Sequence, residues 1–159
     1  MSLAAKLLTE LRVNVGQGGL SISVSERPRM VRCEVVQCEA LAATIDELTL
    51  ETSELAGATI AQLETASRDL ASRVNYLLEP IAPIEIDADG CTVQMRSNPP
   101  QKDDNGWRYY ELSLRRGGAA ALCRYEKPPG QPRTRVPAVL THVVVGRLVD
   151  DFSITIDSI

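Results

Sequence analysis

Four cysteines and one histidine are the residues of this chain that could carry nucleophilic or metal chemistry: Cys33, Cys38, Cys91, Cys123 and His142. A catalytic pair would need one of the thiols to approach His142 in space, and no local spacing predicts such an approach. The sequence has no Cys-x-x-Cys pair, and Cys33 and Cys38 are too far apart for a zinc knuckle. His142 has no nucleophile or orienting carboxylate placed near it by sequence. We therefore expect no catalytic residue, no metal site and no cofactor.

The setting of the cysteines predicts reduced thiols in a cytoplasmic protein. Each lies in a segment of period-two alternation, where a small apolar side chain suits a strand face. The first residues lack the basic and apolar regions of a signal peptide. No apolar run approaches the ~18 residues that a membrane span requires. We therefore expect a cytoplasmic location, free thiols and no insertion into a membrane.

Basic side chains are concentrated in one part of the chain. Residues 91–135 carry 9 basic and 4 acidic side chains and so a net charge of +5, whereas the whole chain has a net charge of −4 and a pI near 5.1. Trp107 and Tyr109 share the polar side of a predicted strand within this segment. The candidate interaction residues are Arg96, Trp107, Tyr109 and Arg124.

Two explanations fit this basic segment. Arginines beside exposed aromatic rings can hold nucleic acid or an acidic peptide. A solvated sheet face also needs polar side chains, and acidic and basic surfaces can neutralise each other within the fold or across a dimer. The acidic pI, the aromatic share of 4% and the lack of a nucleic-acid-binding signature disfavour nucleic acid.

The elements that would position these residues include one long helix. Apolar and small residues recur at spacings of four and three, which places them on one side of an α-helix. Thr52 or Ser53 can cap its start, and Pro80 ends it because the residue before a proline avoids the α region. The pattern predicts a helix over about residues 53–79 with the apolar stripe Ala56, Ile60, Leu63, Ser67, Leu70, Val74 and Leu77.

Shorter helices are expected near both ends of the chain. Ser2 can cap a helix that runs to about Arg12. Thr141 can cap another that runs to about Asp151, with the apolar stripe Val144, Val145, Leu148 and Phe152. The tail, residues 153–159, alternates weakly between apolar and polar residues.

Period-two alternation predicts strands in most of the remaining chain. Residues 20–25 alternate cleanly, and a change of phase between Val35 and Val36 predicts a β-bulge. Asp89-Gly90 predicts a hairpin turn. The expected fold is α+β, a single domain over residues 1–159, with a mostly antiparallel sheet packed on the long helix and shorter helices at the N- and C-terminal ends.

The order helix, three strands, long helix, further strands and final helix resembles that of small acidic bacterial secretion chaperones. The resemblance rests on the order of the elements and on no sequence motif. It implies a dimeric protein-binding module. A homodimer is also favoured because the long helix outreaches any single strand, and because Val144, Val145 and Leu148 offer a second apolar surface.

Three functions remain open at this point. The leading hypothesis is a non-enzymatic cytoplasmic protein-interaction or chaperone-like module, which binds a second copy of itself and another protein. The second is a small enzyme or ligand-binding domain with a pocket between helix and sheet. The third is a nucleic-acid-associated protein that uses the basic 91–135 face.

Overall fold

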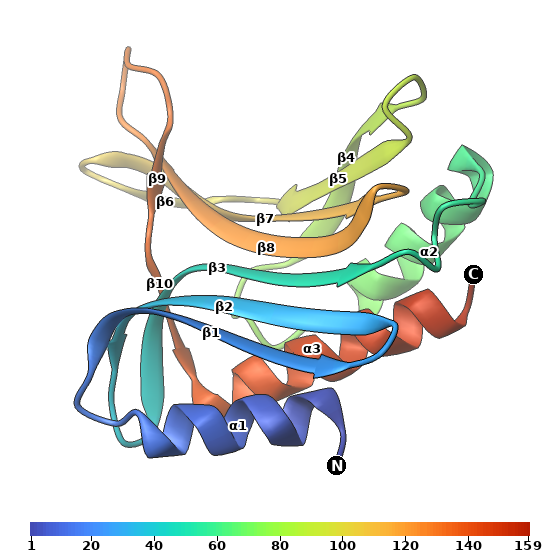
Figure 1. The fold of residues 1–159 in the computed structure, drawn as a ribbon. Helices are drawn as coiled ribbons and strands as arrows, with labels where there is room; N and C mark the ends of the chain where they lie inside the picture. Colours follow the sequence, from blue (N-terminus) through green and yellow to red (C-terminus); the bar gives the residue numbers. More distant parts are fainter.

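A computed structural model describes residues 1–159 as one large antiparallel sheet with three helices on one side of it (Figure 1). The helices are α1 (Leu3–Val13), α2 (Ile60–Arg73) and α3 (His142–Asp157). The strands are β1 (Gly18–Glu26), β2 (Arg29–Cys38), β3 (Ala42–Thr52), β4 (Ile81–Asp87), β5 (Thr92–Ser97), β6 (Gln101–Asp103), β7 (Gly106–Arg115), β8 (Gly118–Lys127), β9 (Thr134–Val136) and β10 (Ala138–Thr141). The predicted α+β class is confirmed.

The main path of the sheet runs β1-β2-β3-β8-β7-β5-β4, and every pair along it is antiparallel. Three short strands extend it: β10 pairs with β3, β9 with β8 and β6 with β7. The first part of β3 pairs with β10 and its second part with β8. The segment β9–β10 therefore fills the place where β3 and β8 diverge.

The helices cover one face of the sheet. In Figure 1, α1 and α3 lie beneath the β1–β3 half, and α2 lies at the other end near the β4–β5 hairpin. The space between helices and sheet is filled by one cluster of 38 buried residues, in which Leu7, Leu48, Leu112 and Phe152 are fully enclosed. Alternate strand residues enter this core because successive side chains point to opposite faces.

The prediction of one long helix over residues 53–79 is wrong in the length of the helix. The helix α2 has only 14 residues, and turns precede it. The Thr59 hydroxyl accepts a hydrogen bond from the Gln62 N–H, while the Gln62 side chain accepts one from the Thr59 N–H. This capping box sets the start of the helix seven residues later than predicted. The fold is accordingly built on the sheet and not on one long helix.

The apolar stripe explains why the helix was predicted too long. Leu63, Ser67 and Leu70 are buried within α2, as expected. Val74 and Leu77 are also buried, although the helix ends at Arg73. The spacing of apolar residues therefore reports burial on both sides of the helix end, while the backbone changes conformation.

The last helix is longer than predicted. It spans 16 residues, and the tail predicted to alternate weakly is helical through Asp157. Asp151 near its centre accepts a hydrogen bond from the Tyr76 hydroxyl at 2.6 Å and pairs with Arg73 at 3.4 Å. These contacts tie α3 to the end of α2.

Several local predictions are confirmed. Ser2 caps α1 by accepting a hydrogen bond from the Ala5 N–H. The β2–β3 register shifts on either side of Val35, which is the predicted bulge, and Val36 is exposed there. The β4–β5 hairpin turns at Asp89-Gly90. All four cysteines are buried and free of disulfides.

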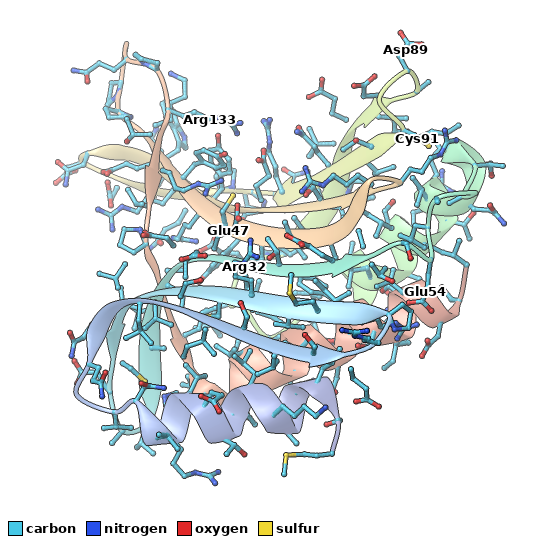
Figure 2. All side chains as sticks on the ribbon, viewed as in Figure 1. Arg32, Glu47, Glu54, Asp89, Cys91 and Arg133 are labelled. Carbon is cyan, nitrogen blue, oxygen red and sulfur yellow. The ribbon has the colours of Figure 1, made fainter.

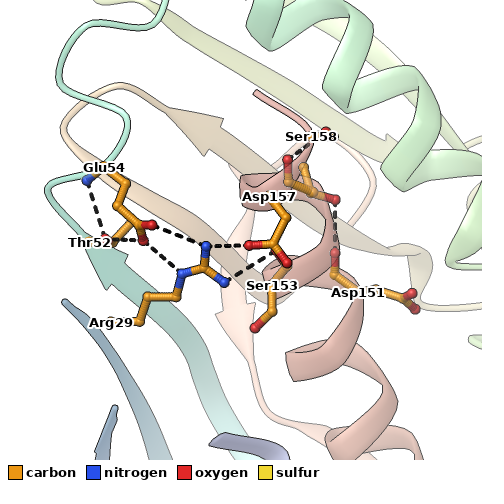
Figure 3. A network of polar contacts seen from close by, with 8 residues as sticks. Arg29, Thr52, Glu54, Asp151, Ser153, Asp157 and Ser158 are labelled. Carbon is orange, nitrogen blue, oxygen red and sulfur yellow. Dashed lines mark hydrogen bonds and ion pairs between the residues drawn. The ribbon is translucent and has the colours of Figure 1, made fainter. Parts of the chain in front are cut away.

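One arginine links three elements at the edge of the helix layer (Figure 3). The Arg29 guanidinium at the start of β2 donates to Glu54 at 2.7 Å and to Asp157 at 2.5 Å. Glu54 lies just after β3, and Asp157 ends α3. The hydrogen bonds from Arg29 lower the pKa of Glu54. This contact closes the C-terminal turn of α3 onto the sheet.

Candidate functional site

The face of the sheet opposite the helices is concave. Figure 1 shows β7 and β8 curving between the β4–β5 hairpin on one side and the loop before β9 on the other. We call the outward-facing side chains of β5, β7, β8 and β9 in this trough, together with Arg133 just before β9 and Glu47 on β3, the concave face. Figure 2 shows Arg133 near its rim and Glu47 on β3 below. Because strands alternate, the residues that line it are the neighbours in sequence of core residues.

A buried carboxylate organises the centre of the concave face. The Glu111 side chain is only 8% exposed, and it accepts hydrogen bonds from Arg96 Nε at 3.2 Å and Arg133 Nη1 at 2.9 Å. Two guanidinium groups therefore share one carboxylate. A buried charge needs such partners to offset the loss of its hydration. The arrangement leaves one excess positive charge on partly exposed arginines.

Two tyrosines support these arginines. The rings of Tyr109 and Tyr125 stack with their centroids 5.8 Å apart. The Arg133 guanidinium carbon lies 3.8 Å from the Tyr125 ring centroid, and that of Arg96 lies 5.5 Å from the Tyr109 centroid. Burial acts to lower the pKa of Arg133, but its hydrogen bonds to Tyr109 and Glu111 outweigh burial and raise it. The guanidinium positions are thus held by cation–π contacts as well as by ion pairs.

The concave face continues toward β3 through a further ion pair. Arg135 on β9 reaches Glu47 on β3 at 3.2 Å. Both side chains line a hollow of about 210 Å³, which is also lined by Arg115 and by Cys123. Burial raises the pKa of the Cys123 thiol, which therefore stays protonated at neutral pH. The hollow is a shallow polar depression without an activated nucleophile.

The structure places three of the four predicted interaction residues on this side of the sheet. Arg96 and Tyr109 contact each other at its centre. Trp107 lies two residues earlier on β7, where Lys102 Nζ is 5.5 Å from its ring centroid. Arg124 lies elsewhere. It pairs across the β7–β8 ladder with Tyr110 on the opposite face.

Sequence reasoning did not select Glu111 and Tyr125 as site residues. The β7–β8 register pairs Glu111 with Cys123 and Tyr109 with Tyr125. A two-residue turn at Gly117-Gly118 would have placed Glu111 opposite Arg124, whereas the observed pairs centre on Gly117 and place it opposite Cys123. The glycine pair therefore predicts the hairpin but not its register.

The cysteine–histidine pair considered from the sequence does come together in part. Cys38 Sγ lies 3.9 Å from His142 Nε2. Cys38 is fully buried, its S–H donates to the Leu11 carbonyl at 3.1 Å, and burial raises its pKa. A nucleophilic cysteine needs the opposite, namely a lowered pKa and access for a substrate. The contact ties the end of α1 to β2 and to the start of α3.

Other chemical possibilities have little support in the geometry. No three histidine, cysteine, aspartate or glutamate side chains are grouped so that they could hold a metal ion. None of the three helices combines the length and the apolar content needed to cross a membrane. No protein-family model, curated protein or solved structure matches this chain.

Proposed function

We propose that this chain is a non-enzymatic cytoplasmic protein-interaction module, chaperone-like in its use, which binds an acidic segment of a partner protein on the concave face. The observation that carries the proposal is the shared carboxylate of Glu111, which holds Arg96 and Arg133 in fixed positions on a curved sheet. Guanidinium groups that are already fixed in position before a ligand arrives bind carboxylates with less loss of side-chain entropy.

The charge of the concave face favours an acidic partner. The concave face carries four arginines and two carboxylates: Arg96, Arg115, Arg133, Arg135, Glu47 and Glu111. The difference is two positive charges, on a chain whose net charge is −4. An acidic segment would be steered to this face and away from the remaining surface.

A protein partner fits this face better than nucleic acid does. Single-stranded nucleic acid binds such sheets by stacking bases on open aromatic rings. Here Arg133 covers the ring of Tyr125, Arg96 lies over Tyr109, and Tyr109 is only 9% exposed. The rings support the guanidinium groups and offer little free surface for a base.

The enzyme or ligand-binding alternative has less support. It required a pocket between helix and sheet, and that space is occupied by the continuous core of 38 residues. The thiol nearest to a histidine, Cys38, is buried and hydrogen-bonded to a backbone carbonyl.

A homodimer remains part of the proposal, on grounds that differ from those expected. Val145 and Leu148 are fully buried in their own chain and are not available to a partner. Support comes instead from the edge strand β4, where Ile84 and Ile86 are each 48% exposed. A two-fold contact would use this edge twice. Light scattering across a range of concentrations tests it, and a mass of 17.3 kDa throughout would exclude it.

The proposed interaction is tested with a defined acidic probe. Fluorescence anisotropy of a labelled poly-glutamate peptide is measured against the whole chain, beside a labelled oligothymidylate of matched charge. We expect the peptide to bind in a salt-dependent manner. Arg133→Gln should weaken binding at least about fivefold, because one positioned guanidinium is lost.

The matched control is Arg12→Gln, an equal change of charge at an exposed position on α1. It should leave the affinity nearly unchanged. Equal losses in the two variants would mean that net charge alone attracts the peptide. Tighter binding of the oligothymidylate than of the peptide would support the nucleic-acid alternative instead.

A further inference from the structure

The remaining candidate residue, Arg124, lines a second cleft. This cleft lies on the face of β7 and β8 opposite the concave face and has a volume of about 570 Å³. The segment after α2, the start of β6 and the β9–β10 junction form its walls, and no helix residue lines it. Its polar residues include Glu79, Arg108, Tyr110 and Arg124, and its apolar wall consists of prolines and aliphatic side chains.

The Arg124 guanidinium is buried but only partly paired. Its side chain is 10% exposed, and its Nη2 donates to Glu79 Oε2 at 2.9 Å and to Gln101 Oε1 at 3.1 Å. Its carbon lies 4.2 Å from the Tyr110 ring centroid. Its Nη1 is buried and has no hydrogen-bond partner. A charged donor in this state is costly and uncommon.

Two further polar atoms of the cleft are unpaired in the same way. Glu79 Oε1 and Arg108 Nε are buried without partners. Of the four such side-chain atoms in the chain, three belong to residues of this one cleft. These three atoms are two hydrogen-bond donors and one acceptor. A ligand that satisfies all of them must supply two acceptors and one donor.

The rim of the cleft carries a second anomaly. Leu78 is 96% exposed and has a φ of 64°, a conformation that favours glycine. A large apolar side chain is thus held in solvent at a strained backbone position. Val139 on the opposite wall is 69% exposed. Both side chains would lose contact with water if a ligand filled the cleft.

We propose that this cleft binds the C-terminal residue of a peptide that ends in an aliphatic side chain. The carboxylate accepts hydrogen bonds from Arg124 Nη1 and Arg108 Nε. The amide N–H of the same residue donates to Glu79 Oε1, and the side chain contacts Leu78 and the prolines. Arg108 pairs with Glu126 at 3.5 Å and Arg124 pairs with Glu79, so a carboxylate ligand would be held by the two unpaired donors Arg124 Nη1 and Arg108 Nε.

This inference goes beyond the proposed function and uses none of the residues of the concave face. The test is a titration of the whole chain with N-acetyl-leucine, followed by backbone amide chemical shifts. We expect saturable shifts at Leu78, Gln101 and Tyr110. N-acetyl-leucinamide, which lacks the carboxylate, and isocaproate, which lacks the amide N–H, should each bind at least about tenfold more weakly.

Three variants connect the binding to the cleft. Arg124→Gln should weaken N-acetyl-leucine at least about tenfold, and Arg108→Gln, at a position with a 43% exposed side chain, gives the same test with less risk to folding. Leu78→Gly relieves the positive φ, so it should keep or raise the melting temperature while weakening binding. Arg68→Gln, an equal change of charge on exposed α2 surface, should leave binding unchanged.

The possible outcomes separate the two proposals. No saturable shift, or equal binding of N-acetyl-leucinamide, would overturn the carboxylate site. Equal binding of isocaproate would overturn the assignment to a peptide terminus. Arg133→Gln on the concave face should not alter the titration, so failure of the acidic-peptide proposal would not imply failure of this one.

Discussion

The two faces of this sheet are made by alternate residues of the same strands, yet they are stabilised in different ways. On β7, Leu112 and Leu114 are fully buried beneath the helices, whereas Glu111, which directly precedes Leu112, is buried by arginines on the concave face. Apolar burial is non-directional, while an ion-pair lattice requires particular positions of each group. The helix-covered face is therefore held mainly by apolar packing, and the concave face by directional contacts between charged groups.

The largest effect should come from the helix-covered face. Leu70→Ala in α2 should lower the free energy of unfolding by about 2–5 kcal/mol, because truncation of a fully buried leucine leaves a cavity. Arg68→Ala on the exposed side of the same helix should change it by less than about 0.5 kcal/mol. Urea denaturation measures both. Similar losses would show that α2 doesn't bury the side that its apolar residues indicate.

A smaller effect is expected at the centre of the concave face. Glu111→Gln removes the charge that Arg96 and Arg133 share, and it should cost about 1–3 kcal/mol. The estimate is below that for a fully buried pair because these arginines are 31% and 36% exposed. Urea denaturation beside the exposed control Glu10→Gln checks it. No change in the free energy of unfolding for Glu111→Gln would mean that the Glu111 ion pairs do not hold the two arginines in place.

Acid should reveal the contribution of the Arg29 contact. The pKa of Glu54 is lower in the folded chain, so its ionised form stabilises the fold above its unfolded pKa of about 4.3. That contribution is lost as pH falls through the folded value. Because Glu54 is 35% exposed, we expect Glu54→Gln to cost less than about 1 kcal/mol near neutral pH, and a smaller amount near pH 3. An equal difference at both pH values would contradict this assignment.

The smallest difference concerns thiol reactivity and not stability. Cys123 on the concave face is 8% exposed, whereas Cys33 on the helix-covered face is fully buried, and burial raises the pKa of Cys33 to about 12. A thiol reagent followed by mass spectrometry should label Cys123 before Cys33, and all four cysteines should react quickly once the chain is denatured. Earlier labelling of Cys33 would contradict the assignment of the two faces.

Much of the fold could be predicted because local signals and burial agree. Ser2 and Thr141 cap helices as their side chains predict, and the phase change after Val35 is a bulge. The extent of α2 could not be predicted from periodicity, because Val74 and Leu77 are buried on a non-helical segment. The Thr59–Gln62 capping box was the local signal for its start.

The candidate site was only partly predictable. Period two places Arg96, Trp107 and Tyr109 on one side of their strands, but the face on which Arg124 lies depends on its pairing with Tyr110. The contacts of Glu111 with Arg96 and Arg133 join β7 to β5 and to the loop before β9. Contacts between segments so far apart in the chain can be predicted only once the pairing register of the strands is known.

The most direct test of the functional proposal is to map where an acidic partner binds. Backbone amide shifts of the whole chain are recorded during titration with the poly-glutamate peptide. We predict that the largest shifts occur at Tyr109, Ser113 and Tyr125 on the concave face, and that Arg133→Gln abolishes them. Shifts confined to α1, α2 and α3, or spread evenly over the surface, would contradict the proposal that the concave face is the binding surface.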